Sequence, residues 1–285
     1  MCSDKTMKIS DASSSWTVSI YKNDIYEHLK ILEQQRLPYQ RRSPQLQYRC
    51  GLVIYLKELI DKVSFCRVTL HLAVFLLDFF MDSHSVKPEK LTLIAFTCLV
   101  LAGKFEEHER KVPTICDMNE YLNSDYIQKD IIYLEHKILK YFNWKLNMPT
   151  AVHFAEYFLN FALIPNDFLC KNCSRFNHYN IMKHCLDSFV DRSLEDDLLI
   201  SYPPSFVAAS CLLAVRITMN LDPVWPDQLE EVTTYSESDL KICSARILGC
   251  REECQKKRKR KLELSPDQGY ETEKGCCVTP KAKKE

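Results

Sequence analysis

The sequence predicts an all-helical protein. Only five of the 285 residues are glycine. Glycine makes up about 7% of an average protein, which would be about 20 residues here, so we expect few tight turns. Residues 70–81 and 91–103 are apolar around nearly their whole helical circumference, which is typical of helices at the centre of a bundle. Both stretches are too short to cross a bilayer, which takes about 20 apolar residues. We therefore expect soluble-type helical bundles with buried central helices.

The chain divides into four segments by composition and length. A domain of about 150 residues is typical, so 285 residues suggest two domains. We place them at residues 37–148 and 149–252, after an N-terminal segment, 1–36, that contains one helix. Residues 253–285 are basic and then poor in apolar side chains, and we expect this tail to be disordered.

Helical spacing of apolar residues places the elements of the first half. Ile25, Leu29 and Leu32 predict a helix over Trp16–Glu33. Ser43 is the expected cap of a second helix that begins at Pro44, since proline is favoured in a first turn. The remaining helices of the first domain are expected at 70–81, 91–107, about 113–122, and from Ser124 or Asp125 to Phe142.

The second half has the same plan, with an apolar helix at its centre. Residues 206–215 are almost entirely apolar and predict that central helix. The other helices are expected at 150–163, about 177–193, a short stretch after Pro226, and about 237–252, with the central helix spanning 204–219. Each domain is therefore predicted to contain five helices.

Composition argues against an enzyme or a general polyanion binder. Lys plus Arg and Asp plus Glu both number 38, so no net charge favours nucleic acid or membrane. The five glycines lie too far apart for a phosphate-binding loop, and no catalytic set is visible. We expect no cofactor and no small-molecule substrate. The polar start of the chain carries no secretory signal, so the 14 cysteines are expected to be free thiols.

One cysteine pair has zinc-like spacing. Cys170 and Cys173 are two residues apart, with His178, His184 and Cys185 nearby. A structural zinc site usually needs a second such pair, which is missing, so we predict no metal site.

Several motifs resemble those of the cyclin family. Residues 70–74 read Leu-His-Leu-Ala-Val, and residues 101–107 read Leu-Ala-Gly-Lys-Phe-Glu-Glu, where cyclins have Ser in place of Gly103. Leu134-Glu135-His136, followed by Trp144-Lys145-Leu146 and Pro149-Thr150, is similar to the end of a first cyclin box. The ordered set covers roughly residues 37–250. The resemblance implies two stacked five-helix cyclin boxes that bind and activate a cyclin-dependent serine/threonine kinase as a heterodimer in cell-cycle control, without chemistry of their own.

The resemblance also implies which residues would contact the kinase. Lys104 and Glu135 match positions that hydrogen-bond kinase backbone, and Phe105, Trp144 and Leu146 match positions that pack on the kinase regulatory helix. Without the resemblance, Phe105 and Leu146 read as core residues, and Lys104 and Glu135 as ordinary solvated charges.

Two further roles are implied for the helix around residue 50. Asp78 lies within an apolar helix and needs a partner, because burying a lone carboxylate is costly; the family match is Arg49, which implies a buried ion pair. Tyr48, Leu52 and Tyr55 match part of a substrate-docking patch. Gly51 removes a side chain from the centre of that patch, so simple packing of Leu52 and Tyr55 is an equal alternative.

The basic run in the tail suggests a location in the cell. Lys256, Lys257, Arg258, Lys259, Arg260 and Lys261 are six consecutive cations. Nuclear import is the favoured interpretation, with the cytoplasm as a second compartment; nucleic-acid contact and a solvated helix end are the alternatives. Base stacking would need interleaved aromatic residues, and the run has none.

Two other function classes compete with kinase regulation. A cyclin-fold transcription or RNA-processing factor, acting as a scaffold or nucleic-acid binder, would need a basic face on the folded domains, and here the concentrated charge is in the tail. An enzyme using Cys and His would need a cysteine of lowered pKa beside a histidine. We therefore expect a protein partner rather than nucleic acid or a membrane.

Overall fold

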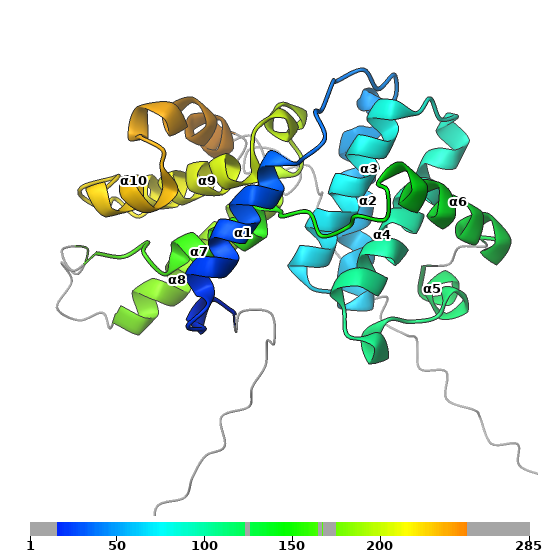
Figure 1. Ribbon diagram of the computed structural model, residues 1–285, viewed down its shortest axis with the longest axis horizontal. Helices are drawn as coiled ribbons and strands as arrows, with labels where there is room; N and C mark the ends of the chain where they lie inside the picture. Colours follow the sequence, from blue (N-terminus) through cyan, green and yellow to red (C-terminus); the bar gives the residue numbers. More distant parts are fainter. Residues whose placement is uncertain (1–15, 123–125, 165–166, 168–174, 250–285) are drawn as a thin grey trace, which may run out of the picture. The chain divides into compact units, whose positions relative to one another are not determined.

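The chain folds entirely into helices in the part that the structure describes. A computed structural model describes residues 16–122, 126–164, 167 and 175–249, and it contains no strand among them (Figure 1). None of the described helices is long and apolar enough to cross a lipid bilayer. The tail from 253 onward, its basic run, and Cys170 and Cys173 lie outside the described residues, so nuclear import stays a prediction.

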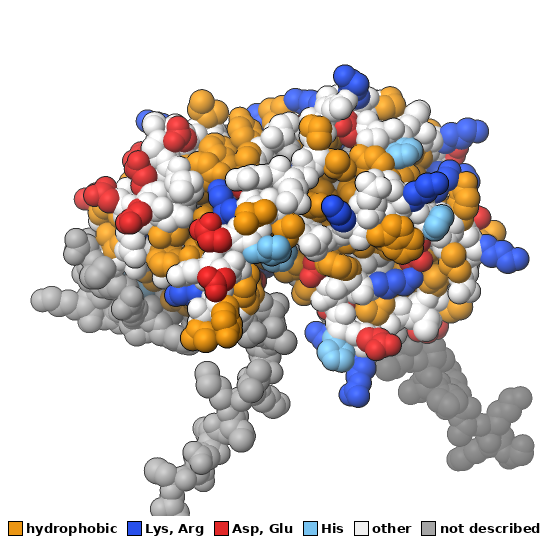
Figure 2. All heavy atoms as spheres, viewed as in Figure 1, with side chains coloured by type: hydrophobic (Ala, Val, Ile, Leu, Met, Phe, Trp, Pro, Cys, Tyr) orange, Lys and Arg blue, Asp and Glu red, His pale blue; other side chains and the backbone are white. Residues whose placement is uncertain are grey.

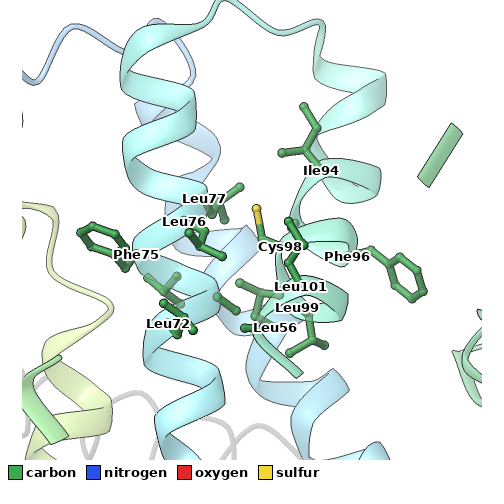
Figure 3. Packing of buried hydrophobic residues seen from close by; sticks show 14 of the residues in the cluster. Leu56, Leu72, Phe75, Leu76, Leu77, Ile94, Phe96, Cys98, Leu99 and Leu101 are labelled. Atoms are coloured by element: carbon green, nitrogen blue, oxygen red, sulfur yellow. The ribbon is translucent and has the colours of Figure 1, made fainter. Parts of the chain in front are cut away.

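The first bundle is built around two buried helices. Its helices are α2 (Leu46–Val63), α3 (Arg67–Ser83), α4 (Leu91–Glu106), α5 (Ile115–Leu122) and α6 (Gln128–Tyr141). The prediction that 70–81 and 91–103 form central helices is confirmed, since every residue of α3 from Val68 to Met81 is buried. The side chains of α3 and α4 interdigitate, with α2 alongside them (Figure 3). Burying each large aliphatic side chain here contributes about 1.5–3 kcal/mol.

Two helices of this bundle begin later than the sequence predicts. Helix α2 starts at Leu46, and Ser43 lies outside it with its hydroxyl accepting the backbone N–H of Gln45 at 3.2 Å. The prediction of Ser43 as the helix cap is therefore wrong by two positions, although its hydroxyl still satisfies a backbone donor at the helix entry. Helix α6 starts at Gln128 because Ile127 has an extended backbone, with ψ of 124°.

The second bundle repeats the plan around α9. It contains α7 (Ala151–Leu159), α8 (Arg175–Ser193), α9 (Pro204–Thr218), α10 (Asp227–Thr233) and a further helical stretch at 237–249. Helix α9 is buried along nearly its whole length, as predicted. Helix α7 ends at Leu159, four residues before the predicted end at 163.

A buried arginine organises the second bundle, and the sequence analysis missed it. Arg216 on α9 and Asp167 both have fully buried side chains, and their closest atoms, Nη1 and Oδ2, are 2.8 Å apart. The guanidinium also donates to the backbone carbonyls of Ala162, Pro223 and Val224. Burying a charge is tolerable only when it is paired and hydrogen-bonded, and Arg216 meets both conditions. It joins the loops that follow α7 and α9 to the centre of the bundle.

The N-terminal helix, α1 (Lys22–Gln34), packs on the second bundle. The ring of Tyr26 stacks on Tyr157 with centroids 4.1 Å apart, and its hydroxyl donates to the carbonyl of Val232. The Glu33 carboxylate accepts the backbone N–H and the hydroxyl of Ser205 at 2.7 and 2.8 Å. Because Ser205 is in the first turn of α9, the charge of Glu33 also complements that helix terminus. The helix at the start of the chain is thus a fixed part of the second bundle.

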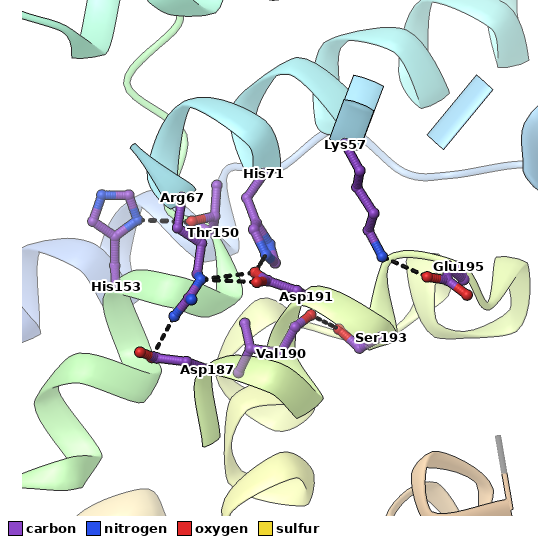
Figure 4. A network of polar contacts seen from close by, with 10 residues as sticks. All are labelled: Lys57, Arg67, His71, Thr150, His153, Asp187, Val190, Asp191, Ser193 and Glu195. Carbon is purple, nitrogen blue, oxygen red and sulfur yellow. Dashed lines mark hydrogen bonds and ion pairs between the residues drawn. The ribbon is translucent and has the colours of Figure 1, made fainter. Parts of the chain in front are cut away.

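A polar network joins the two bundles (Figure 4). Arg67, at the start of α3, forms ion pairs with Asp187 and Asp191 of α8 at 2.5 and 2.9 Å. His71 Nε2 lies 3.3 Å from Asp191, and burial lowers the pKa of this histidine, so the neutral ring donates to the carboxylate. Lys57 of α2 reaches Glu195 at 2.5 Å. These contacts fix the first bundle against α8 and the residues that directly follow it.

The connection between the bundles is held by a histidine that must stay neutral. His153 Nδ1 accepts the backbone N–H of Thr150 at 3.1 Å, which satisfies a donor at the start of α7. Burial, with a smaller effect from the nearby His71, lowers the pKa of His153 to about 4. Protonation of Nδ1 would remove the acceptor and so weaken this helix start.

Replacing His153 should change how stability responds to acid. Between pH 6.5 and 4 the unfolded chain binds a proton at His153 and the folded chain does not, so folding stability falls as the pH drops. The amide oxygen of Gln in His153→Gln can accept the same hydrogen bond. We expect the free energy of unfolding of this variant to fall by about 2 kcal/mol less than that of wild type when the pH is lowered from 7.5 to 4.5. Urea unfolding at the two pH values measures this difference. The exposed-histidine control, His28→Gln, should follow wild type, and identical pH dependence of all three proteins would contradict the account.

Candidate protein-binding site

An exposed ion pair marks the end of α4. Lys104, in the last turn of this buried helix, reaches Glu135 on α6, with Nζ 2.5 Å from Oε1. The lysine side chain is 48% exposed and the glutamate side chain 12%. Exposed pairs of this kind contribute only about 0–1 kcal/mol to stability. Both groups can therefore exchange part of this contact for hydrogen bonds to a partner at little cost.

Large apolar side chains surround this pair at the surface. Phe105, next to Lys104, is 48% exposed, and Trp144, just after α6, is 65% exposed. Ile132 is 52% exposed and lies one turn before Glu135 on the same face of α6. We call Lys104, Phe105, Ile132, Glu135 and Trp144 the α4–α6 surface. Clustered exposed aromatic and aliphatic groups beside polar ones are typical of protein-binding surfaces.

The backbone holds Trp144 in place. Trp144 and Asn143 both have left-handed backbone conformations, with φ of 61° and 49°. The N–H of Trp144 donates to the carbonyl of Leu139 at 2.8 Å, which closes the end of α6. The indole also meets the ring of His136 edge-on at 6.2 Å. A backbone that is already fixed at this position loses little conformational freedom when a partner covers the indole.

Glu107 anchors the end of α4 and is not free for a partner. Its carboxylate accepts the backbone N–H of Cys66 through a short hydrogen bond, and the hydroxyl of Thr69 at 2.7 Å. These donors belong to the first turn of α3, where an acidic group is favoured. The sequence showed two adjacent glutamates but not this role, since the partners are about 40 residues away. Burial and the charge of Glu107 together raise the pKa of the neighbouring Glu106.

Gly103 allows α4 to lie close to Phe65. A Cβ atom at position 103 would be 2.7 Å from Cε2 of the buried Phe65 ring. Most side-chain contacts are longer than that, so the ring or the helix would have to move. Glycine therefore sets the position of the residues that follow it, Lys104 and Phe105.

The structure divides the predicted kinase-binding residues into two groups. It brings Lys104 and Glu135 together and exposes Phe105 and Trp144 beside them, and their contact with a kinase stays a prediction. Leu146 is 7% exposed and packs in the first core, so the alternative interpretation as a core residue fits it better. Ile132 was not predicted to contact the kinase. The available signal in the sequence was an apolar residue that lies away from the apolar face of its helix.

The residues of the predicted substrate-docking patch differ in exposure. Tyr48 is 42% exposed, but Leu52 is 5% exposed and belongs to the core. Tyr55 is half-buried, and its hydroxyl lies 3.5 Å from that of Tyr126. Gly51 offers no side chain between them. The packing alternative fits Leu52 and Tyr55 better, and substrate docking at this patch stays a prediction.

Arg49 and Asp78 form the expected buried pair. Nε and Nη2 of Arg49 lie 2.7 and 2.9 Å from the two carboxylate oxygens, and both residues are at most 3% exposed. The bidentate geometry pairs the two buried charges and gives each carboxylate oxygen a donor, whereas Nη1 of Arg49 is buried without a hydrogen-bond partner. This pair joins α2 to α3 within the first core.

No metal site is found among the described residues, and two of their cysteines lie deep in the cores. No group of three or more His, Cys, Asp or Glu side chains in the described part of the chain could hold a metal ion. Burial raises the pKa of the Cys98 and Cys211 thiols, which opposes formation of a reactive thiolate. The two cysteines pack as small apolar side chains in the two cores.

Comparison with models of known protein families shows which family this chain belongs to. The model of the cyclin N-terminal domain matches residues 20–147, and that of the cyclin C-terminal domain matches residues 149–279. This chain belongs to the cyclin family. The relatives that it resembles include cyclin J of Xenopus laevis, at 33% identity, and cyclin J of Homo sapiens, at 32%. Both alignments cover 79% of this chain, which spans about 60% of the length of these relatives.

Solved structures show the same fold. A viral cyclin from herpesvirus saimiri superimposes with a TM-score of 0.66 at 16% identity, covering 79% of this cyclin and 97% of the viral chain. A chain of a Chaetomium thermophilum CAK complex superimposes with a TM-score of 0.54 at 11% identity, covering 93% and 95% of the two chains. The predicted architecture of two tandem cyclin domains is confirmed.

Two glycine substitutions should have opposite effects on stability. Alanine in place of glycine within a helix normally stabilises by about 1 kcal/mol. Gly51 has no atom within 4 Å of a built Cβ, so we expect Gly51→Ala to raise the free energy of unfolding by about 1 kcal/mol. Gly103→Ala should instead lower it by about 1–2 kcal/mol because of Phe65. Chemical denaturation measures both, and an equal stabilisation at the two sites would contradict the close contact.

Proposed function

We propose that this cyclin is a regulatory subunit that binds and activates a cyclin-dependent serine/threonine protein kinase in cell-cycle control. The observation that carries the proposal is the α4–α6 surface, where exposed aromatic and aliphatic groups surround the Lys104–Glu135 pair. A few apolar anchors beside charged groups account for most of the binding energy at typical interfaces. Membership of the cyclin family and the matching positions of these residues support the same partner.

The proposed mechanism needs no chemistry from the cyclin. Lys104 can donate hydrogen bonds to backbone carbonyls of the kinase, and Glu135 can accept hydrogen bonds from backbone N–H groups of the kinase. Phe105, Ile132 and Trp144 would pack on the kinase regulatory helix and hold it inward, where its glutamate pairs with the lysine at the ATP site. A partner activates only if it binds the active arrangement more tightly than the inactive one. A rigid α4–α6 surface favours tighter binding to the active arrangement, because the surface fits one position of the kinase regulatory helix.

The test is co-purification with a panel of cyclin-dependent kinases, followed by a kinase assay on each complex. Wild type should bind and activate at least one kinase. Loss of a central charged pair should weaken binding by about 2 kcal/mol or more, roughly 30-fold, so Lys104→Ala/Glu135→Ala should lose both binding and activation. Circular dichroism and thermal unfolding check that the variant still folds.

A matched ion pair provides the control. Arg41 and Asp197 are also 2.5 Å apart, with side chains 44% and 35% exposed, and lie outside the α4–α6 surface. Arg41→Ala/Asp197→Ala should keep binding and activation. Binding without activation would indicate a scaffold or an inhibitor. If no kinase binds wild type, the proposal fails and nucleic-acid or transcription-factor partners become the alternative.

A further inference from the structure

A groove in the first bundle lies outside the α4–α6 surface. It is a groove of about 500 Å³ between the end of α3, the connecting residues 84–90, the start of α4, and α6. Pockets of about 300–1,000 Å³ are typical of ligand sites, so this groove can accept one or two side chains. We call it the α3–α6 groove.

The groove and the α4–α6 surface occupy different faces of α6. Tyr133, Lys137, Lys140 and Tyr141 line the groove, and they recur at helical spacing along one face. Ile132 and Glu135 are offset from that face, and neither lines the groove. A partner in the groove therefore need not compete with one at Lys104 and Glu135, and the inference does not depend on the proposed kinase.

The floor of the groove is apolar and preformed. Phe80 and Ile94 are each 3% exposed, while Leu93 and Leu134 are half-buried and reach the groove. The ring of His84 stacks on Phe80 with centroids 4.2 Å apart. Tyr141 meets His84 edge-on, and its hydroxyl is 2.6 Å from that of Ser83. These contacts fix the aromatic walls, so an apolar side chain could enter without rearranging them.

Four lysines lie around this apolar floor. Lys87 and Lys90 come from the α3–α4 connection, and Lys137 and Lys140 from α6. All four are exposed, and none forms an ion pair with a carboxylate within the part of the chain that the structure describes. Among the described lining residues Asp130 is the one carboxylate. Figure 2 shows Lys and Arg side chains gathered on the side of this view where α6 lies, with hydrophobic side chains between them.

We propose that the α3–α6 groove docks an acidic peptide segment of a partner protein, with an apolar residue on the floor and carboxylates beside the lysines. The positive rim and apolar floor complement such a segment. No arginine lines the groove among the described residues, and arginine forks are the preferred partners of a single phosphate. Lysines spread over two walls instead match several carboxylates along an extended chain.

The test is fluorescence anisotropy with the full chain and defined peptides. The probe is fluorescein-labelled Glu-Asp-Glu-Phe-Glu-Asp-Glu, which has one apolar anchor between acidic residues. A second peptide replaces Phe with Gly, a third replaces every acidic residue with Lys, and a fourth carries one phosphoserine in an otherwise neutral sequence around Phe. The first peptide should bind at least about tenfold more tightly than the other three, with affinity that falls as salt is raised.

Charge reversal locates the binding site. Lys137→Glu/Lys140→Glu should weaken binding of the first peptide by at least about tenfold. Leu93→Gln, which makes the half-buried floor polar, should weaken it without changing the charge. The control, Lys111→Glu/Lys241→Glu, alters the net charge equally at exposed lysines outside the groove and should change binding less than about twofold.

Three results would overturn the proposal. Equal weakening by both charge reversals would show general electrostatic attraction to the surface. Equal binding of the Phe and Gly peptides would show that the floor is not used. Tight binding of the phosphoserine peptide alone would assign the groove to phosphate. Because these measurements use the cyclin without any kinase, their failure leaves the proposed kinase-binding role untouched.

Discussion

The packing of α4 against α3 is the constraint on which the candidate binding surface depends. Helix α4 is apolar on all sides, and from Ile94 to Gly103 each of its residues is buried. A helix advances about 1.5 Å per residue, so fixing its buried part also fixes the residue that follows. Lys104 and Phe105 are the first exposed residues after that run. The hydrophobic core therefore fixes where one charged side chain, Lys104, and one aromatic side chain, Phe105, lie at the surface.

Three further contacts keep this helix end from moving. Phe65 packs directly on Gly103, where a larger residue would not fit. Glu107 binds the first turn of α3, and Lys104 reaches across to α6. Only the last of these is exposed and weak. The end of α4 is thus rigid on its inner side and adaptable on its outer side, a combination that suits a preorganised binding surface.

Each bundle also carries a buried bidentate ion pair: Arg49–Asp78 lies in the first and Arg216–Asp167 in the second. Such pairs add little net stability, because desolvation offsets much of the attraction. Removing one partner is nevertheless costly, about 3–5 kcal/mol, since the other charge is left buried. We infer that these pairs specify how the helices pack more than they stabilise the fold.

The sequence predicted those features that a single segment can encode. Apolar runs identified α3, α4 and α9, and the lone Asp78 in an apolar helix signalled a buried partner. The family motif located Lys104 and Glu135. Features that join distant segments were missed: the contact of Gly103 with Phe65, the capping of α3 by Glu107, and the pairing of Asp167 with Arg216. No periodicity reports such contacts, because each depends on tertiary packing.

We propose that this cyclin contacts a kinase through the α4–α6 surface. Hydrogen–deuterium exchange of the cyclin, alone and in complex with a kinase that it activates, locates the contact, since it reports protection along the whole chain. We expect slower exchange in the complex for peptides covering the end of α4 and for those covering α6 through Trp144. Unchanged exchange in these peptides, with protection confined to the second bundle, would contradict it.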